Sequence, residues 1–303
     1  MLFDFIKERR RDTTLSRVEH KPCVENELSS VVDEENYHKL ITIMEQAAEQ
    51  YGISFDRDSL LVIGTDMLGM LGNHFENVVP LLFSSSYQLA GGMESICSFE
   101  KGKISRRPLI FLNQNVVFTG SGEVMSADVD AVMKQVCLIH YVREYAKMVG
   151  NDDMLSSDFK MEPGYIAWAQ YRASYIGNMV RISINKENKV VGLADDIISV
   201  NSAVRMKLGN AYARKYNSDI SYLLADYFGC IAAWIDMYPE LIRKDRAFIM
   251  DTLYFTKEML DMFYALRGCG ANIDLVTAHR FARLWEVDTD FFMGNMSGYR
   301  RKA

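Results

Sequence analysis

The feature that most constrains this fold is the stretch 126–149, which reads SADVDAVMKQVCLIHYVREYAKMV. Ser126 is a good N-cap, and Asp128 places a carboxylate in the first turn, where it suits the helix dipole. Apolar residues then recur at helical spacing, with one histidine in the same stripe: Val129, Val132, Met133, Val136 and His140. The stretch therefore predicts a helix with one stripe against a core.

The second half of this predicted helix carries the only histidine in a chemically suggestive place. His140 and Glu144 are four residues apart, so they share one face of the helix. Upstream, the run PLIFLNQNVV at 108–117 reads as a buried strand bounded by turn residues. The sequence thus predicts a strand followed by a helix that carries a histidine and a carboxylate on one face.

This strand and helix resemble the active-site region of zincin metallopeptidases. In that family the helix carries HExxH, in which two histidines bind zinc and the glutamate acts as general base. The corresponding residues here are HYVRE. His140 keeps the first ligand position, Tyr141 stands at the base position, and Glu144 stands at the second histidine position.

A later predicted helix, 165–177 (YIAWAQYRASYIG), extends the resemblance to about residues 94–180. Some zincin-like proteins supply a third ligand there from the glutamate of a W-x-E-F-x-A pattern. In this chain the pattern begins at Trp168, and Gln170 stands in place of the glutamate. The resemblance thus implies a zincin-like arrangement in which the base position and two ligand positions of the family pattern are changed.

These changes remove the groups that zinc-dependent hydrolysis requires. The phenol of Tyr141 has an ordinary pKa of about 10, so it is no substitute for a carboxylate base near neutral pH. Gln170 is a neutral amide and a poor zinc ligand. We therefore expect no peptidase activity by the usual mechanism.

Two interpretations of His140 stay open. In the first, His140 is a packed histidine bonded to Glu144 or to a backbone carbonyl, and no metal binds. In the second, His140 and Glu144 hold a metal such as zinc with a third ligand, for which Asp195 and Asp196 are candidates. Cys137, one turn before His140, lies on the apolar stripe and is expected to be a buried, inert thiol.

Composition narrows the class of protein. The chain has 303 residues, of which 49% are hydrophobic, enough for a sizeable core. The formal net charge of −6 argues against bulk nucleic-acid binding. Five scattered cysteines without a CxxC pair favour reduced thiols and a cytoplasmic setting. No apolar run suits a signal peptide or a membrane span, so we expect a soluble protein with no membrane partner.

The order of predicted elements gives an α+β fold. We expect a small, mostly antiparallel sheet packed on the zincin-like central helix, and an all-helical C-terminal half. Its predicted parts are a flexible arm (1–33), a zincin-like α+β region (34–191) and a helical region (192–303). Within the second part, a helix ended by Gly52 is expected at 34–51, and a hairpin is expected around Lys101-Gly102. The Trp168 helix is expected to open near Pro163 and to stop at Gly177-Asn178, and 180–191 is expected to be a hairpin or a loop. In the last part, helices are expected at 193–216 and at 218–237, the latter ended by Pro239.

The segment 272–295 is similar to a helix-turn-helix, with Arg280 and Arg283 as candidate phosphate contacts. Three functional hypotheses follow. The leading one is a catalytically inactive zincin-like scaffold without a cofactor, which binds another macromolecule, expected to be protein. The others are a metal-dependent hydrolase with atypical ligands at His140 and Glu144, and a DNA-associated regulator that uses residues 272–295.

Overall fold

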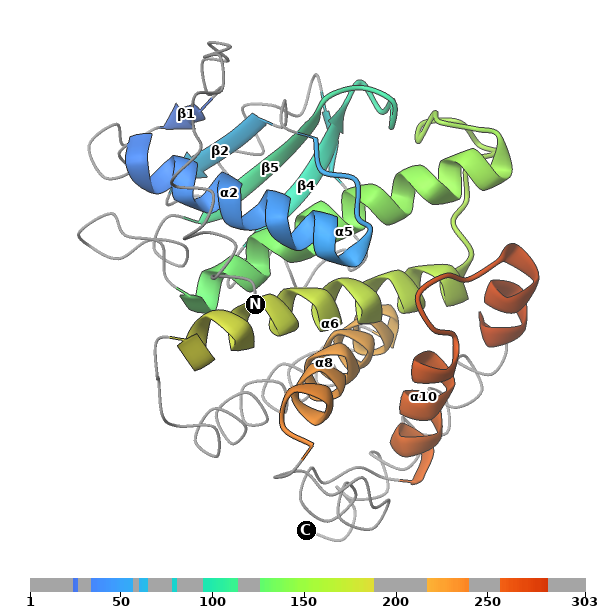
Figure 1. Ribbon diagram of the computed structural model, residues 1–303. Coiled ribbons are helices and arrows are strands. Elements are labelled where there is room, and N and C mark those ends of the chain that lie inside the picture. The colour runs from blue at the N-terminus through green and yellow to red at the C-terminus, as the bar shows by residue number, and fades with distance from the viewer. Residues whose placement is uncertain are drawn as a thin grey trace, which may run out of the picture.

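The computed structural model in Figure 1 has an α+β fold. The residues that it describes are 24–26, 34–56, 60–64, 78–80, 95–113, 126–187, 217–239 and 257–282. Helices make up most of these residues, and one sheet of short strands comes from the N-terminal third of the chain. The α+β class expected from the sequence is confirmed.

Five strands form the sheet in the order β1-β2-β5-β4-β3. Their bounds are Val24–Asn26 (β1), Leu60–Gly64 (β2), Val78–Pro80 (β3), Ser95–Glu100 (β4) and Pro108–Asn113 (β5). β1 pairs with β2, and β2 with β5, in parallel; β5 pairs with β4, and β4 with β3, in antiparallel. The sheet is therefore mixed.

The expectation of a mostly antiparallel sheet was wrong, because two of the four strand pairs are parallel. A hairpin leaves a local turn signal, and the β4–β5 hairpin around Lys101-Gly102 is confirmed. Parallel pairs have no such signal, because their strands are joined by long crossovers such as the one through α2 between β1 and β2. The short β1 also lies inside the segment 1–33 that the sequence suggested was an arm.

Helix α2 (Glu34–Tyr51) has the bounds that its apolar stripe predicts. Leu40, Met44 and Ala48 are buried on that stripe. Gly52 ends the helix with a positive φ of 66°, and the N–H of Ile53 donates to the carbonyl of Ala48 at 2.8 Å. This is the glycine-terminated helix end expected from the sequence.

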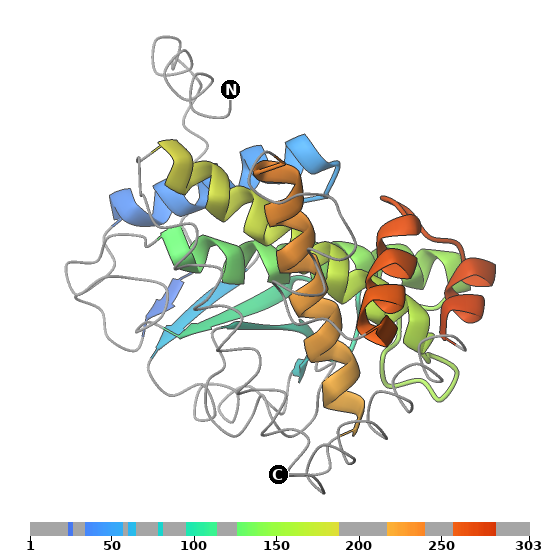
Figure 2. The ribbon, with the colours of Figure 1, turned by 90° about the horizontal axis from the view of Figure 1, so that it is seen from below.

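The central helix α5 (Ser126–Val149) also has its predicted bounds. It packs on strands β4 and β5 on one side and on helix α6 on the other. Figure 2 shows these layers from below, with the sheet, α5 and α6 following one another. The predicted apolar stripe is buried: Val129, Val132, Met133 and Val136 are at most 3% exposed.

Helix α6 (Pro163–Glu187) begins at the proline predicted for its first turn, but it runs past the predicted stop at Gly177-Asn178. A Cβ on Gly177 would lie 2.8 Å from the carbonyl oxygen of Asp130 in α5. The glycine therefore serves close helix packing instead of termination. Asn178 is buried and donates to the carbonyl of Ser174. The hairpin or loop considered from residue 180 is thus helical through residue 187.

Two further labelled helices complete the described part. α8 (Asn217–Met237) ends just before Pro239, as predicted, and crosses α6 so closely that a Cβ on Gly229 would overlap the carbonyl of Tyr171. α10 (Lys257–Gly268) packs on α8, and residues 275–282 are again helical. The predicted helix 193–216 lies outside the described residues.

The described cysteines are all free thiols. Cys97 in β4, Cys137 in α5 and Cys230 in α8 are buried, whereas Cys269 is half-buried. Burial raises the pKa of each of these four thiols. The expectation that Cys137 is an inert buried thiol agrees with this placement.

None of the described helices combines the length and the apolar character needed to cross a bilayer.

Candidate functional site

A polar face on the second half of α5 contains the histidine that the sequence singled out. We define the polar face of α5 as His140, Arg143, Glu144 and Lys147, which recur at helical spacing. Exposure increases along it: the side chain of Arg143 is 20% exposed, that of Glu144 42% and that of Lys147 72%. The face therefore runs from a partly buried histidine to a solvated lysine.

His140 is bonded to the segment that follows α2. The backbone N–H of Ser54 donates to Nδ1 of His140 at 3.2 Å, and the Ser54 hydroxyl oxygen lies 2.9 Å from the same nitrogen. The hydrogen-bond partner expected for this ring was Glu144 or a backbone carbonyl. The partner found is an N–H donor 86 residues away in the sequence.

This hydrogen bond determines the protonation of the ring. A backbone N–H can only donate, so this bond uses the lone pair of Nδ1, whereas the Ser54 hydroxyl can either donate to that nitrogen or accept from it. In the neutral imidazole the hydrogen is then on Nε2. Burial lowers the pKa of His140 from its ordinary value, against the opposing effect of Glu144, so the neutral form is favoured.

Glu144 points to a partner on its own helix. Its Oε1 accepts a hydrogen bond from Nζ of Lys147 at 2.6 Å, on the solvent side of α5. Exposed pairs of this kind contribute little to stability, about 0 to 1 kcal/mol. Glu144 shares a face of α5 with His140, as the sequence predicted, but no hydrogen bond joins these two side chains.

Arg143 joins α5 to two other segments. Its Nε donates to the carbonyl of Ile104 at 3.1 Å, and its Nη2 donates to the carbonyl of Arg106 at 3.0 Å. The same Nη2 lies 3.3 Å from Oδ2 of Asp56. The guanidinium thus holds the β4–β5 turn and the segment after α2 against the central helix.

Tyr141 occupies the position of the catalytic base in the family pattern, and it is part of the core. Its side chain is 4% exposed, and its ring meets the Trp168 ring edge-on at 4.8 Å between centroids. Burial raises its pKa, against the effect of Arg172. The phenol is therefore neutral at physiological pH, and its ring fixes α5 against α6.

Gln170 is directed toward α8. Its Nε2 donates to Oδ1 of Asp226 at 3.3 Å, and Lys134 of α5 reaches the same carboxylate oxygen at 3.0 Å. His140, in contrast, is bonded to Ser54 at the end of α2. The two residues that the family pattern would bring to one metal are engaged with different elements.

The candidate metal ligands do not fit a zinc site in the described part of the chain. A zinc-binding histidine must offer a lone pair, but Nδ1 of His140 already accepts the Ser54 N–H and its Nε2 carries the hydrogen. Nowhere among the described residues do three His, Cys, Asp or Glu side chains group around a common point. The proposed third ligands, Asp195 and Asp196, lie outside the described residues.

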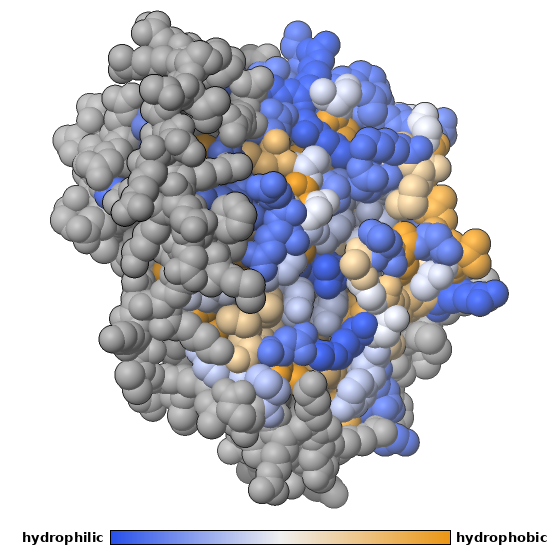
Figure 3. Space-filling model, in the orientation of Figure 1, coloured by the Kyte–Doolittle hydropathy of each residue, from blue (hydrophilic) through white to orange (hydrophobic). Residues whose placement is uncertain are grey.

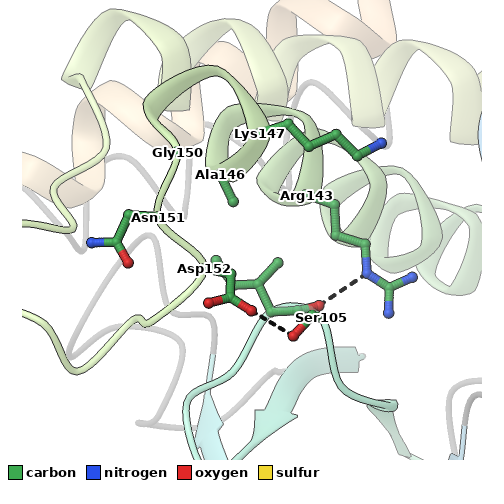
Figure 4. Close-up of a pocket in the computed structure, with 8 residues that line it drawn as sticks. Ser105, Arg143, Ala146, Lys147, Gly150, Asn151 and Asp152 are labelled. Atoms are coloured by element: carbon green, nitrogen blue, oxygen red, sulfur yellow. Dashed lines mark hydrogen bonds between the residues drawn. The ribbon is translucent and has the colours of Figure 1, made fainter.

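A cavity of about 330 Å³ lies beside the polar face of α5. It is lined by Ile104, Ser105, Arg143, Ala146, Lys147, Gly150, Asn151 and Asp152 (Figure 4). Hydrogen bonds tie its walls together: the N–H of Ile104 donates to the carbonyl of Asp152, and the Ser105 hydroxyl donates to the Asp152 carboxylate. The cavity is therefore framed by the end of α5 and by the β4–β5 turn.

The C-terminal segment 272–295 is described only as far as residue 282. Nδ1 of His279 lies 3.6 Å from Oε2 of Glu162, which connects this segment to the start of α6. Arg280 is exposed, and Arg283 lies outside the described residues. The helix-turn-helix therefore stays a prediction.

Sequence reasoning missed the residues that hold the polar face in place. Ser54 and Asp56 follow α2 in a segment without regular structure, and no spacing rule links them to a helix more than 80 residues later. The apolar Ile53 beside them is buried and was the only local sign that this segment packs inward. The β4–β5 turn was predicted as a turn but not as part of the site.

Comparison with known proteins adds no further assignment. Neither the family models nor the curated proteins nor the solved structures gave a match to this chain.

Proposed function

We propose that this protein is a catalytically silent zincin-like scaffold that acts by binding another protein. The observation that carries the proposal is the hydrogen bond from the Ser54 N–H to Nδ1 of His140. It gives the one retained histidine of the family pattern a structural task, because the lone pair of Nδ1 is already used in a contact with Ser54.

The other changed positions support the same function. Tyr141 packs its ring on Trp168, and Gln170 bonds to Asp226 of α8. Both residues contribute to the contacts between helices, where a peptidase would hold a base and a ligand. Each of these two replacements thus has a contact that stabilises the fold.

Surface features support binding of a protein. Hydrophilic residues cover most of the described surface in Figure 3, and apolar residues gather along one edge. The side chains of Leu155 and Val276 are 68% and 62% exposed, in the segment after α5 and in the helical residues 275–282. Contiguous exposed apolar surface marks interaction sites, whereas apolar residues exposed singly are common on any protein.

The test is elemental analysis of the purified full chain together with a peptidase assay on a mixed peptide substrate. We expect less than about 0.1 zinc per chain, no turnover, and the same result for His140→Ala. Stoichiometric zinc that is lost in His140→Ala, or turnover that is lost with it, would overturn the proposal. His140→Asn, which keeps an acceptor for the Ser54 N–H, repeats the comparison if His140→Ala fails to fold.

A further inference from the structure

The β4–β5 turn carries positive charge that contrasts with the chain as a whole. Residues 101–107 read KGKISRR, with four basic residues and no acidic one, in a chain whose formal net charge is −6. We define the basic turn as residues 101–107. Because it is on the surface, it gives one region of an acidic protein a positive field.

Part of this charge is not neutralised by neighbouring side chains. Nζ of Lys103 pairs with Oδ2 of Asp153 at 2.8 Å. Lys101 and Arg106 are exposed, and no ion pair joins either side chain to a residue in the described ranges. The basic turn therefore offers two solvated cations to a partner.

The cavity described above opens beside the basic turn. Ile104 and Ser105 of the turn form one wall, and Ala146, Gly150 and the neighbouring end of α5 form another. In Figure 4, Ser105 and Asp152 lie side by side near the centre of the view, with Lys147 above them and Arg143 beside them. Ile104 and Ala146 give the cavity apolar walls, and its volume of about 330 Å³, at the small end of the range for ligand pockets, is large enough to admit one apolar side chain.

Apolar side chains are exposed at the end of α5 and in the loop that follows it. Val149 in the last turn of α5 is 38% exposed, and Leu155 in the loop beyond it is 68% exposed. The segment is held to the basic turn by the N–H of Met154, which donates to the carbonyl of Gly102 at 2.8 Å. The cavity, the exposed apolar residues and the basic turn are therefore parts of one surface.

We propose that this surface binds an acidic segment of a partner protein, with one apolar side chain of that segment seated in the cavity. The inference rests on the proposed function, and it names the chemistry of the partner. Charge complementarity selects the occupant: Lys101 and Arg106 attract carboxylates, whereas a second copy of this acidic chain would be repelled overall. The cavity supplies the apolar anchor point that charged contacts alone do not.

The experiment uses a random twelve-residue peptide library displayed on phage, selected on the immobilised full chain. We expect enriched peptides to combine two or more Asp or Glu residues with one Leu, Ile, Met or Phe. A synthetic copy of an enriched peptide should bind more weakly as ionic strength increases. Replacing its apolar residue with Ala should weaken binding about tenfold, and this comparison needs no variant of the protein.

Protein variants locate the binding site. Lys101→Asn with Arg106→Gln removes both solvated cations, and Asn suits the positive φ of 50° at position 101. We expect this double variant to bind the peptide about tenfold more weakly. Lys257→Gln with Arg280→Gln, at exposed sites outside this surface, changes the net charge equally and should bind as the wild type does.

A cavity variant completes the test. Ala146→Leu partly fills the cavity and should lower affinity by a similar factor, provided that its thermal midpoint shows a folded chain. The inference is overturned by a selection that gives no enrichment, or by enriched peptides without acidic residues. Equal loss of binding in the two double variants overturns it as well. None of these outcomes depends on zinc content or turnover, so they are distinct from a failure of the proposed function.

Discussion

The backbone N–H of Ser54 donates to Nδ1 of His140 across 3.2 Å, and this one contact joins the segment after α2 to the central helix. The donor cannot reverse its role, so the contact exists only while Nδ1 is unprotonated. Protonation of Nδ1 would break this bond and leave the Ser54 hydroxyl oxygen, 2.9 Å away, as the acceptor for the new hydrogen. The stability of the protein should therefore depend on the charge of His140.

The first prediction concerns pH. Burial holds the pKa of His140 below its ordinary value of 6.5, so the unfolded chain takes up this proton more readily than the folded chain. The stability contributed by the neutral ring is thus present above pH 6.5 and is lost as the pH falls below it. Glu144 works against the shift, while Lys147 and Arg143 add to it.

The measurement is urea unfolding between about pH 7 and pH 5, on either side of the ordinary histidine pKa, compared with His140→Asn. The asparagine keeps an acceptor for the Ser54 N–H and does not titrate, so its stability should fall less over this range. If the wild type instead gains stability relative to His140→Asn as the pH falls, the charged ring has a partner and our assignment is wrong.

The second prediction concerns Gly177. A Cβ there would lie 2.8 Å from the carbonyl of Asp130 and 3.2 Å from Cγ of Lys134, so Gly177→Ala should push α6 away from α5. We expect a loss of about 1–3 kcal/mol in the free energy of unfolding, in spite of the better helix propensity of alanine.

Gly268→Ala is the matched control, because a Cβ on Gly268, at the end of α10, would have no atom within 4 Å. It should be neutral or should stabilise the chain by up to about 1 kcal/mol. Equal effects of the two substitutions, measured by denaturant unfolding, would contradict a packing role for Gly177.

The third prediction compares two cations on the polar face of α5. Arg143→Met removes the donors to Ile104 and Arg106 together with the ion pair to Asp56, at a cost of about 1–3 kcal/mol. Lys147→Met breaks only a solvated pair with Glu144 and should change stability by less than about 0.5 kcal/mol. Thermal and urea unfolding measure both, and a larger effect at Lys147 would refute the ranking.

Three helices show what the sequence could and could not predict. The bounds of α2 and α5 were predicted to the residue, because each segment has an apolar stripe and a local signal at one end. The signal is Gly52 after α2 and Ser126 at the start of α5. The end of α6 was missed, because Gly177 is a stop signal locally and a packing contact in three dimensions. The close contact with Asp130 overrides the local preference, and no pattern within α6 reveals it.

The candidate site was predictable only in part. Spacing along α5 placed His140 and Glu144 on one face, as found. Their partners were not predictable, since Ser54, which bonds to His140, comes from a distant segment, and Lys147 pairs with Glu144. The parallel strand pairs were missed for the same reason: long-range pairing leaves no short-range signal.

The fourth prediction restores one residue of the family pattern. Gln170→Glu would replace the amide that donates to Asp226 with a second carboxylate, and Lys134 offsets only part of the repulsion. We expect the free energy of unfolding to be lower by about 1 kcal/mol at about pH 7. This loss should become smaller as the pH falls below about 4.5, where the new carboxylate is protonated. Elemental analysis should show no added zinc.

Gln170→Met is the control for this substitution, because it also removes the hydrogen bond but adds no charge. Its loss of stability should change less between about pH 4 and pH 7 than that of Gln170→Glu, since only the carboxylate of Asp226 is left to titrate. A Gln170→Glu protein that gains zinc and stability together would show that the side chain reaches His140, contrary to the contacts found.

The three buried cysteines in the described part of the chain can report which layers separate during local opening. Cys97, Cys137 and Cys230 belong to a strand, the central helix and α8, so each thiol samples a different layer. A thiol reagent can modify each one only when its own layer separates from the next. Mass spectrometry of labelling over time would then rank the order in which the layers come apart, with no probe introduced.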